Sequence, residues 1–111
     1  SMRRRLRVEL NELDPWRNVL LRLTWPEATI ASLDGTTLHL MRRGPRPTVI
    51  VMNPPFSRDA HGRKDALAGL RHLHSALKTI TDGGRLVAVM PGWCESGTRN
   101  AQAFARATAG A

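Results

Sequence analysis

The sequence predicts an α/β domain in which short parallel strands alternate with helices, and two observations support this prediction. Residues 48–52 and 86–90 are short runs that are apolar on both faces, which is typical of buried parallel strands. Between them, residues 63–81 carry large aliphatic side chains at helical spacing. These side chains are Leu67, Leu70, Leu73, Leu77 and Ile80. Such a strand–helix–strand order predicts a right-handed crossover with the two strands parallel.

The same order is found earlier in the chain. Residues 6–13 and 28–33 are each predicted to form a strand. Between them, Asp14 is a good cap for a helix that begins at Pro15 and ends before Pro26. The apolar residues of this helix fall at positions i, i+3, i+4 and i+7 and form one stripe. They are Trp16, Val19, Leu20 and Leu23.

The remaining segments read as connections and a tail. Residues 38–41 are a further short element, and residues 42–47 form a basic loop with two prolines. Residues 100–109 are rich in alanine and predict a weak helix. We therefore expect a single domain, with its core in residues 6–91 and a weak helical tail in residues 92–111.

The composition limits the class of protein. The chain has 111 residues, of which 41% are hydrophobic and 23% charged, which fits one ordinary globular domain. No apolar run approaches the roughly 18 residues that cross a bilayer, so we expect no membrane partner. The single cysteine, Cys94, excludes an internal disulfide and suits a reducing, cytoplasmic location.

The charge favours an anionic partner. Seventeen Lys and Arg against nine Asp and Glu give a net charge of +8, which favours nucleic acid or a nucleic-acid-processing complex. General solvation, or the arginine bias of a GC-rich genome, explains the same excess and stays open. Six basic residues flank the motif described next and are candidates for phosphate contacts, with loop solvation as the alternative. They are Arg42, Arg43, Arg46, Arg58, Arg63 and Lys64.

The string Asn53-Pro54-Pro55-Phe56 follows a predicted strand directly and has the residue types needed to bind an aromatic amine. The Asn53 side-chain oxygen and the Pro54 carbonyl can each accept one N–H of such an amine, which helps to localise its lone pair. Two prolines stiffen the backbone and carry no competing N–H. Phe56 offers a flat face on which a flipped base can stack. The alternative is a plain strand-ending turn with an aromatic residue in the core.

This motif resembles the catalytic motif of amino-group methyltransferases that act on adenine N6. The resemblance implies S-adenosylmethionine as cofactor and catalytic roles for Asn53, Pro54, Pro55 and Phe56. Glu12, at the end of the first strand, matches the acidic residue that holds the ribose hydroxyls of the cofactor. Asp34 matches the carboxylate that accepts from the cofactor's adenine amine. Taken alone, Glu12 is better explained as a solvated strand-end acid and Asp34 as part of an Asp-Gly turn.

A wider pattern resembles the methyltransferase-like domain at the front of bacterial strawberry-notch-type proteins, which are often encoded on mobile elements. Its segments are residues 11–15, 25–26, 51–57, 70–77 and 82–89. The resemblance covers residues 6–91 and implies a partial Rossmann-like methyltransferase fold.

A complete domain of that family begins with a strand and a glycine-rich loop that hold the methionine part of the cofactor. Only eleven residues precede Glu12, so we expect a truncated domain that binds S-adenosylmethionine weakly or not at all. The missing strand belongs between residues 6–13 and 48–52. We therefore expect about four mainly parallel strands in one sheet, with the gap closed by direct pairing, by a second copy in a homodimer, or by a partner's strand.

Three functions stay open. The first is a truncated adenine-N6 methyltransferase-like domain with little or no activity alone. The second is a small basic binding protein from a mobile element, of the anti-CRISPR or anti-restriction type. The third is a split enzyme whose other half supplies the glycine loop. We expect no metal site, because His61, His72 and His74 do not form a ligand set.

Overall fold

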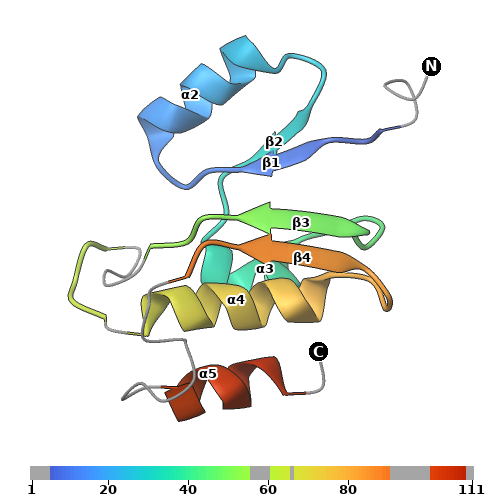
Figure 1. Cartoon of the computed structure of the whole chain (residues 1–111). Coiled ribbons are helices and arrows are strands. Elements are labelled where there is room, and N and C mark those ends of the chain that lie inside the picture. The colour runs from blue at the N-terminus through green and yellow to red at the C-terminus, as the bar shows by residue number, and fades with distance from the viewer. Residues whose placement is uncertain (1–5, 56–60, 66, 91–100, 110–111) are drawn as a thin grey trace. The chain divides into compact units, whose positions relative to one another are not determined.

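The computed structural model describes residues 6–55, 61–65, 67–90 and 101–109. The chain divides into two compact units, Ser1–Asp34 and Gly35–Ala111. Each unit contains a strand–helix–strand arrangement with a parallel pair of strands (Figure 1). The mixed α/β class and the predicted order of strands and helices are therefore confirmed.

The first unit consists of β1 (Glu9–Asn11), α2 (Pro15–Thr24) and β2 (Thr29–Ala31). β1 and β2 are parallel, with Leu10 opposite Ile30. The helix starts where the sequence predicts, because the Asp14 side chain accepts a hydrogen bond from the Arg17 amide and Pro15 occupies the first turn.

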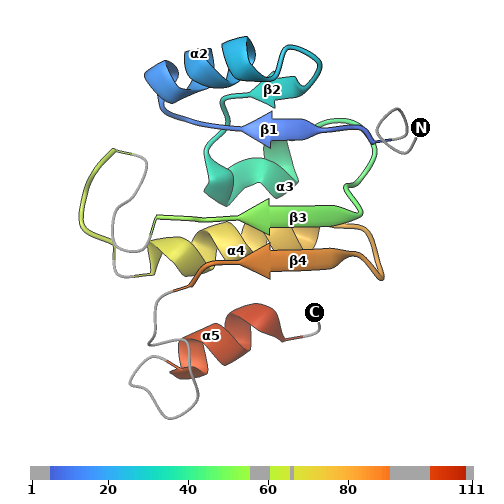
Figure 2. The same ribbon diagram turned by 45° about the horizontal axis from the view of Figure 1, so that its top comes forward.

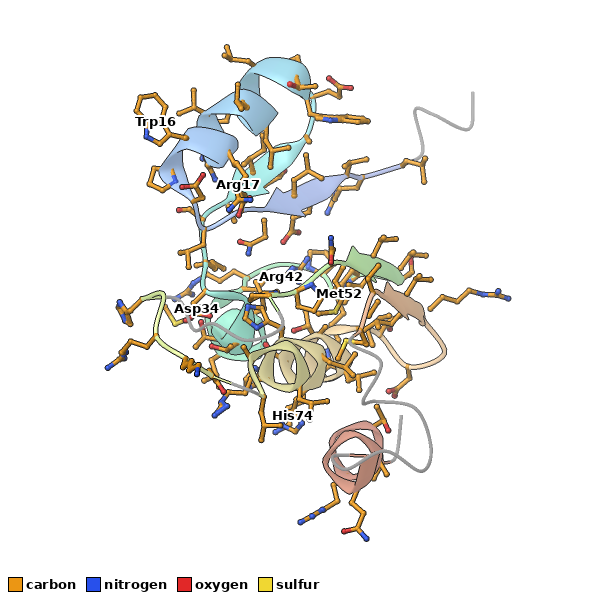
Figure 3. All side chains as sticks on the ribbon, turned by 60° about the vertical axis from the view of Figure 1, so that its left-hand side comes forward. Trp16, Arg17, Asp34, Arg42, Met52 and His74 are labelled. Carbon is orange, nitrogen blue, oxygen red and sulfur yellow. The ribbon has the colours of Figure 1, made fainter. Side chains whose placement is uncertain are left out.

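The apolar stripe of α2 does not pack on the strands of its unit. Trp16 is 80% exposed and Leu23 is 75% exposed, and Val19 and Leu20 are exposed as well. Figure 3 shows Trp16 pointing away from both strands. The buried residue of the helix is Asn18, whose polar side chain faces the strand ends. Helical periodicity locates the apolar stripe correctly, but it does not show which face packs on the strands.

The second unit consists of a short 3₁₀ turn η1 (Gly35–Thr37), α3 (Leu38–Met41), β3 (Val49–Met52), α4 (Ala68–Thr79), β4 (Arg85–Ala88) and α5 (Ala101–Thr108). β3 and β4 are parallel, with Ile50 opposite Leu86. Figures 1 and 2 show α4 lying along one face of this pair. α5 lies within the predicted C-terminal helix.

Helix α4 forms the core of the second unit. It packs against η1, α3, β4 and α5, and is buried on most sides. Leu70 and Leu73 of the predicted stripe are buried, together with the small residues Ala68 and Ala76. The small side chains let neighbouring elements approach closely, which explains why burial extends beyond the leucine stripe. The helix predicted over residues 63–81 is thus confirmed, but it is shorter than predicted. It begins at Ala68 and ends at Thr79.

The four described strands form two sheets of two strands, not the single four-stranded sheet that the sequence suggests. β1 pairs only with β2, and β3 only with β4, among the residues that the structure describes.

Candidate functional site

The Asn-Pro-Pro segment lies at the carboxyl end of β3, where ligands bind in parallel α/β sheets. Asn53 is exposed, and within the described ranges no hydrogen bond engages its side-chain amide. Pro54 is buried and Pro55 is exposed. A buried proline directly after an exposed amide fixes the backbone while leaving the amide available to a ligand. Phe56, the predicted stacking residue, lies outside the described residues.

Glu12 follows β1 directly and its carboxylate is already engaged. Its Oε1 lies 3.0 Å from the Arg17 Nε, and its Oε2 accepts from the Asp14 amide at 3.4 Å. The Arg17 Nε also lies 3.3 Å from the Asp14 carboxylate. Figure 3 shows Arg17 lying back toward β1. A diol that binds Glu12 must therefore share this carboxylate with Arg17 or displace it.

Asn18 fixes the backbone at the ends of both strands of the first unit. Its Nδ2 donates to the Glu12 and Ala31 carbonyls, both at 3.0 Å, and its Oδ1 accepts from the Arg22 Nε at 2.9 Å. All hydrogen-bonding capacity of the amide nitrogen is used. Asn18 thereby holds the Glu12 backbone in place. Asn18 lies on the face of α2 opposite the apolar stripe, where sequence reasoning expects solvent, so the sequence pattern gave no signal of this role.

Asp34 is half-buried and follows a backbone segment that Asn11 holds. The Asn11 Nδ2 donates to the Leu33 carbonyl at 2.9 Å, and its Oδ1 accepts from the Leu33 amide at 2.9 Å. The side chain thus imitates a further strand pairing beyond β2. Glu12 and Asp34 consequently follow the carboxyl ends of two adjacent parallel strands, which is where the resemblance expects them.

The six predicted phosphate-binding residues do not lie together. Arg63 and Lys64 are exposed and follow β3 on the same side as Asn53. Arg46 precedes β3 and donates to the Lys78 carbonyl at the end of α4, at 3.3 Å. An extended strand rises about 3.3 Å per residue, so Arg46 and Asn53 lie at opposite ends of β3.

Arg42 and Arg43 lie in the segment that leads into β3. Arg42 is half-buried, and its Nη2 donates to the Pro45 carbonyl at 2.7 Å, whereas Arg43 is exposed. Arg58 lies outside the described residues. Of the six, Arg63 and Lys64 are the described residues that follow β3 in the chain, as Asn53 does.

An ion pair that the sequence analysis missed fixes the segment after this basic pair. The Asp65 Oδ2 lies 3.1 Å from the Arg71 Nη1, and the Asp65 Oδ1 accepts from the Leu67 amide at 3.1 Å. The Asp65 side chain is mostly buried. Asp65 therefore joins the segment carrying Arg63 and Lys64 to the first turn of α4, which limits how far these cations can move from β3.

Another contact that the sequence did not indicate joins α3 to α4. The Ser75 hydroxyl lies 2.8 Å from the His39 Nδ1 and accepts from the His39 amide at 3.2 Å. A serine beside an imidazole suggests nucleophilic chemistry, but Ser75 is fully buried and no substrate can reach it. The pair serves packing between the two helices. His74 is exposed, and its ring stands edge-to-face against the His39 ring.

The described residues include no group of three or more His, Cys, Asp or Glu that could hold a metal ion. The cofactor implied by the resemblance fits these residues only in part. Glu12 and Asp34 suit its ribose and adenine, whereas no segment in the described ranges places several glycines between a strand end and a helix. The methionine end of the cofactor therefore finds no cradle among the described residues.

The two units differ in charge. The unit that contains Asn53 has eleven Lys and Arg against four Asp and Glu, whereas the unit that contains Glu12 has six against five. Almost the whole positive excess therefore belongs to the unit that contains Asn53. A polyanion would be attracted chiefly to this second unit.

Comparisons with family models, with curated proteins and with solved structures found no match to this chain. Among the helices that the structure describes, none is long and apolar enough to cross a membrane.

Proposed function

We propose that the chain is an adenine-directed methyltransferase-like domain of the S-adenosylmethionine class, with little or no methyl transfer as an isolated chain. The observation that carries the proposal is the state of Asn53. It is an exposed amide without a described hydrogen bond, it follows a parallel strand, and a buried proline stands next to it. An amide in a structural turn would ordinarily bond to its own backbone.

In this proposal the exocyclic amine of an extruded adenine donates its two N–H groups to the Asn53 side-chain oxygen and the Pro54 carbonyl. This leaves the nitrogen lone pair directed away from the protein acceptors and toward a methyl donor. Arg63 and Lys64, on the same side of β3, bind the phosphates beside the extruded nucleotide. Phe56 stacks on the base by analogy with the family.

Glu12 and Asp34 are proposed to hold the nucleoside end of the cofactor. The Arg17 ion pair on Glu12 and the lack of a described glycine loop both oppose tight binding. We therefore expect S-adenosylmethionine to bind the isolated chain more weakly than micromolar, which isothermal titration measures. A micromolar dissociation constant would show that the chain holds the methionine end by residues other than those considered above.

The experiment for the proposed function compares the wild-type chain with Asn53→Ala in binding a short single-stranded DNA containing one adenine. Because the Asn53 side chain has no described bond within the protein, the substitution should leave folding unchanged and remove one hydrogen bond to the base. A net loss of about 1 kcal/mol corresponds to a roughly fivefold weaker complex. Arg43→Ala, which replaces an exposed arginine that precedes β3 in the chain, is the matched control for loss of a surface side chain.

A basic binding protein of the inhibitor type is the second candidate, and the charge of the second unit favours it. This function needs the cations and not the amide. Under it, Asn53→Ala leaves binding intact, and replacing Arg63 and Lys64 together with glutamine weakens it. The same pair of variants therefore separates the two candidates.

A further inference from the structure

The exposed face of the β3–β4 pair is apolar. Along each strand, half-buried residues alternate with exposed ones, and α4 lies along one face of the pair (Figure 1). The exposed set contains four valines. Their exposed fractions are 59% for Val49, 78% for Val51, 61% for Val87 and 56% for Val89.

Such a face is unusual for parallel strands. Parallel sheets are almost always covered on both faces, because the crossover helices lie on them. Here α4 covers one face, and the valines occupy the other. β-branched residues on a strand are also typical of a surface that packs against another element. The face therefore has the composition of a covered surface.

The chemistry of the expected cover follows from the charges at the ends of this face. Arg85 is exposed, lies opposite Val49, and belongs to the same face by alternation with Val87. Arg46 donates to the Lys78 carbonyl at the end of α4, which covers the other face, so among the described residues it is Arg85 that the strand register places on the valine face. Asp82, in the turn between α4 and β4, is exposed.

Two occupants fit this surface poorly. A nucleic-acid backbone satisfies Arg85 but offers no apolar group to the valines, so it would leave them uncovered. A second copy that presents the same valine face brings an equal excess of positive charge to the interface, since this unit has eleven Lys and Arg against four Asp and Glu. Like charges brought together at an interface oppose association.

We propose that the valine face, defined as Val49, Val51, Val87, Val89 and Arg85, binds an amphipathic helix of a partner protein whose apolar side is flanked by acidic residues. Five strand residues at about 3.3 Å each span roughly 16 Å, which a helix of about eleven residues covers at 1.5 Å per residue. The leucines of such a helix would cover the valines, and its carboxylates would pair with Arg85. This inference does not depend on methyl transfer or on Asn53.

The test uses two designed helical peptides of about 18 residues, each with a leucine face and a fluorescent label. In one, glutamates flank the leucine face, and in the other, lysines occupy the same positions. Fluorescence anisotropy should show that the glutamate peptide binds the full chain at least tenfold more tightly than the lysine peptide. Val51→Lys should abolish this binding, and Arg85→Glu should reverse the preference between the peptides.

Leu40→Lys is the matched control, because Leu40 is an equally exposed apolar residue of α3 away from this face. It should leave peptide binding unchanged. Circular dichroism checks that each variant is folded, and Val87→Lys replaces Val51→Lys if the latter is not. The proposal is overturned if the two peptides bind equally, or if neither binds with a dissociation constant below 100 µM (a binding free energy of about 5.5 kcal/mol). It is also overturned if sedimentation shows a dimer of the chain that Val51→Lys dissociates.

Discussion

Replacing Gly35 by alanine should destabilise the second unit through a single neighbour, the His72 ring. A Cβ built on Gly35 would lie 2.3 Å from the His72 Cδ2 and 2.9 Å from its Nε2. Carbon atoms in contact normally lie about 3.5–4.0 Å apart, so the ring must move by more than 1 Å. No left-handed backbone conformation is involved at Gly35, so the effect is steric alone.

The cost follows from what holds the ring. The His72 Nδ1 lies 2.8 Å from the Ala68 carbonyl, and because a carbonyl only accepts, this nitrogen carries the proton of the hydrogen bond. Moving the ring breaks a bond worth about 1 kcal/mol and forces a rotamer change that costs about 0.5–1.5 kcal/mol. We therefore expect Gly35→Ala to lower the free energy of unfolding by about 2 kcal/mol.

A double-mutant cycle makes the prediction sharp. In a His72→Ala background the added methyl group meets no ring, so Gly35→Ala should change the free energy of unfolding by less than about 0.5 kcal/mol. Urea unfolding followed by far-ultraviolet circular dichroism measures all four chains. Equal costs in the two backgrounds would refute the reasoning, as would a negligible cost in the wild-type background.

Three further substitutions test other parts of the structure. Gly84→Ala should lower the free energy of unfolding by about 1–3 kcal/mol, because the added Cβ would lie 2.9 Å from the Thr48 carbonyl oxygen, a backbone atom that cannot rotate away. Urea unfolding measures this change, and an unchanged free energy of unfolding would contradict the prediction. Asn18→Ala removes three hydrogen bonds of a buried amide and should cost about 2–3 kcal/mol in thermal or urea unfolding, with an effect below 1 kcal/mol counting against its role. Arg17→Gln should change stability by less than about 1 kcal/mol, since the Arg17 side chain is exposed. It should also strengthen adenosine binding if Glu12 accepts the ribose, and unchanged binding by titration argues against that role.

Much of the element order follows from local signals. Asp14-Pro15 defines the start of α2 and the unbroken apolar runs define β3 and β4, because capping and strand composition act within a few residues. The leucine period likewise indicates α4. These features depend on near neighbours, which is why sequence reasoning reaches them.

Tertiary choices were harder to predict. The stripe led by Trp16 is exposed while Asn18 is buried, because the Asn18 amide donates to the Glu12 carbonyl and also to the Ala31 carbonyl, which already accepts from the Glu12 amide. Periodicity weighs hydrophobicity and not these hydrogen bonds. The two separate sheets also could not be predicted from strand composition alone, since pairing depends on which edges meet.

The candidate site was predicted unevenly for the same reason. Asn53 and Glu12 lie at the carboxyl ends of β3 and β1, as predicted, because a residue that follows a strand in the sequence must lie at the carboxyl end of that strand. The engagement of Glu12 by Arg17 depends on side-chain geometry one helical turn away. The basic residues looked like one group along the sequence, yet β3 separates Arg46 from Lys64.

The most direct measurement compares the binding of two single-stranded DNA oligonucleotides that differ only at one base, adenine in one and purine, which lacks the exocyclic amine, in the other. The account predicts that the wild-type chain binds the adenine oligonucleotide about tenfold more tightly, the equivalent of two hydrogen bonds at about 0.7 kcal/mol each, and that Asn53→Ala reduces this preference. Equal affinity of the wild-type chain for both oligonucleotides would contradict it.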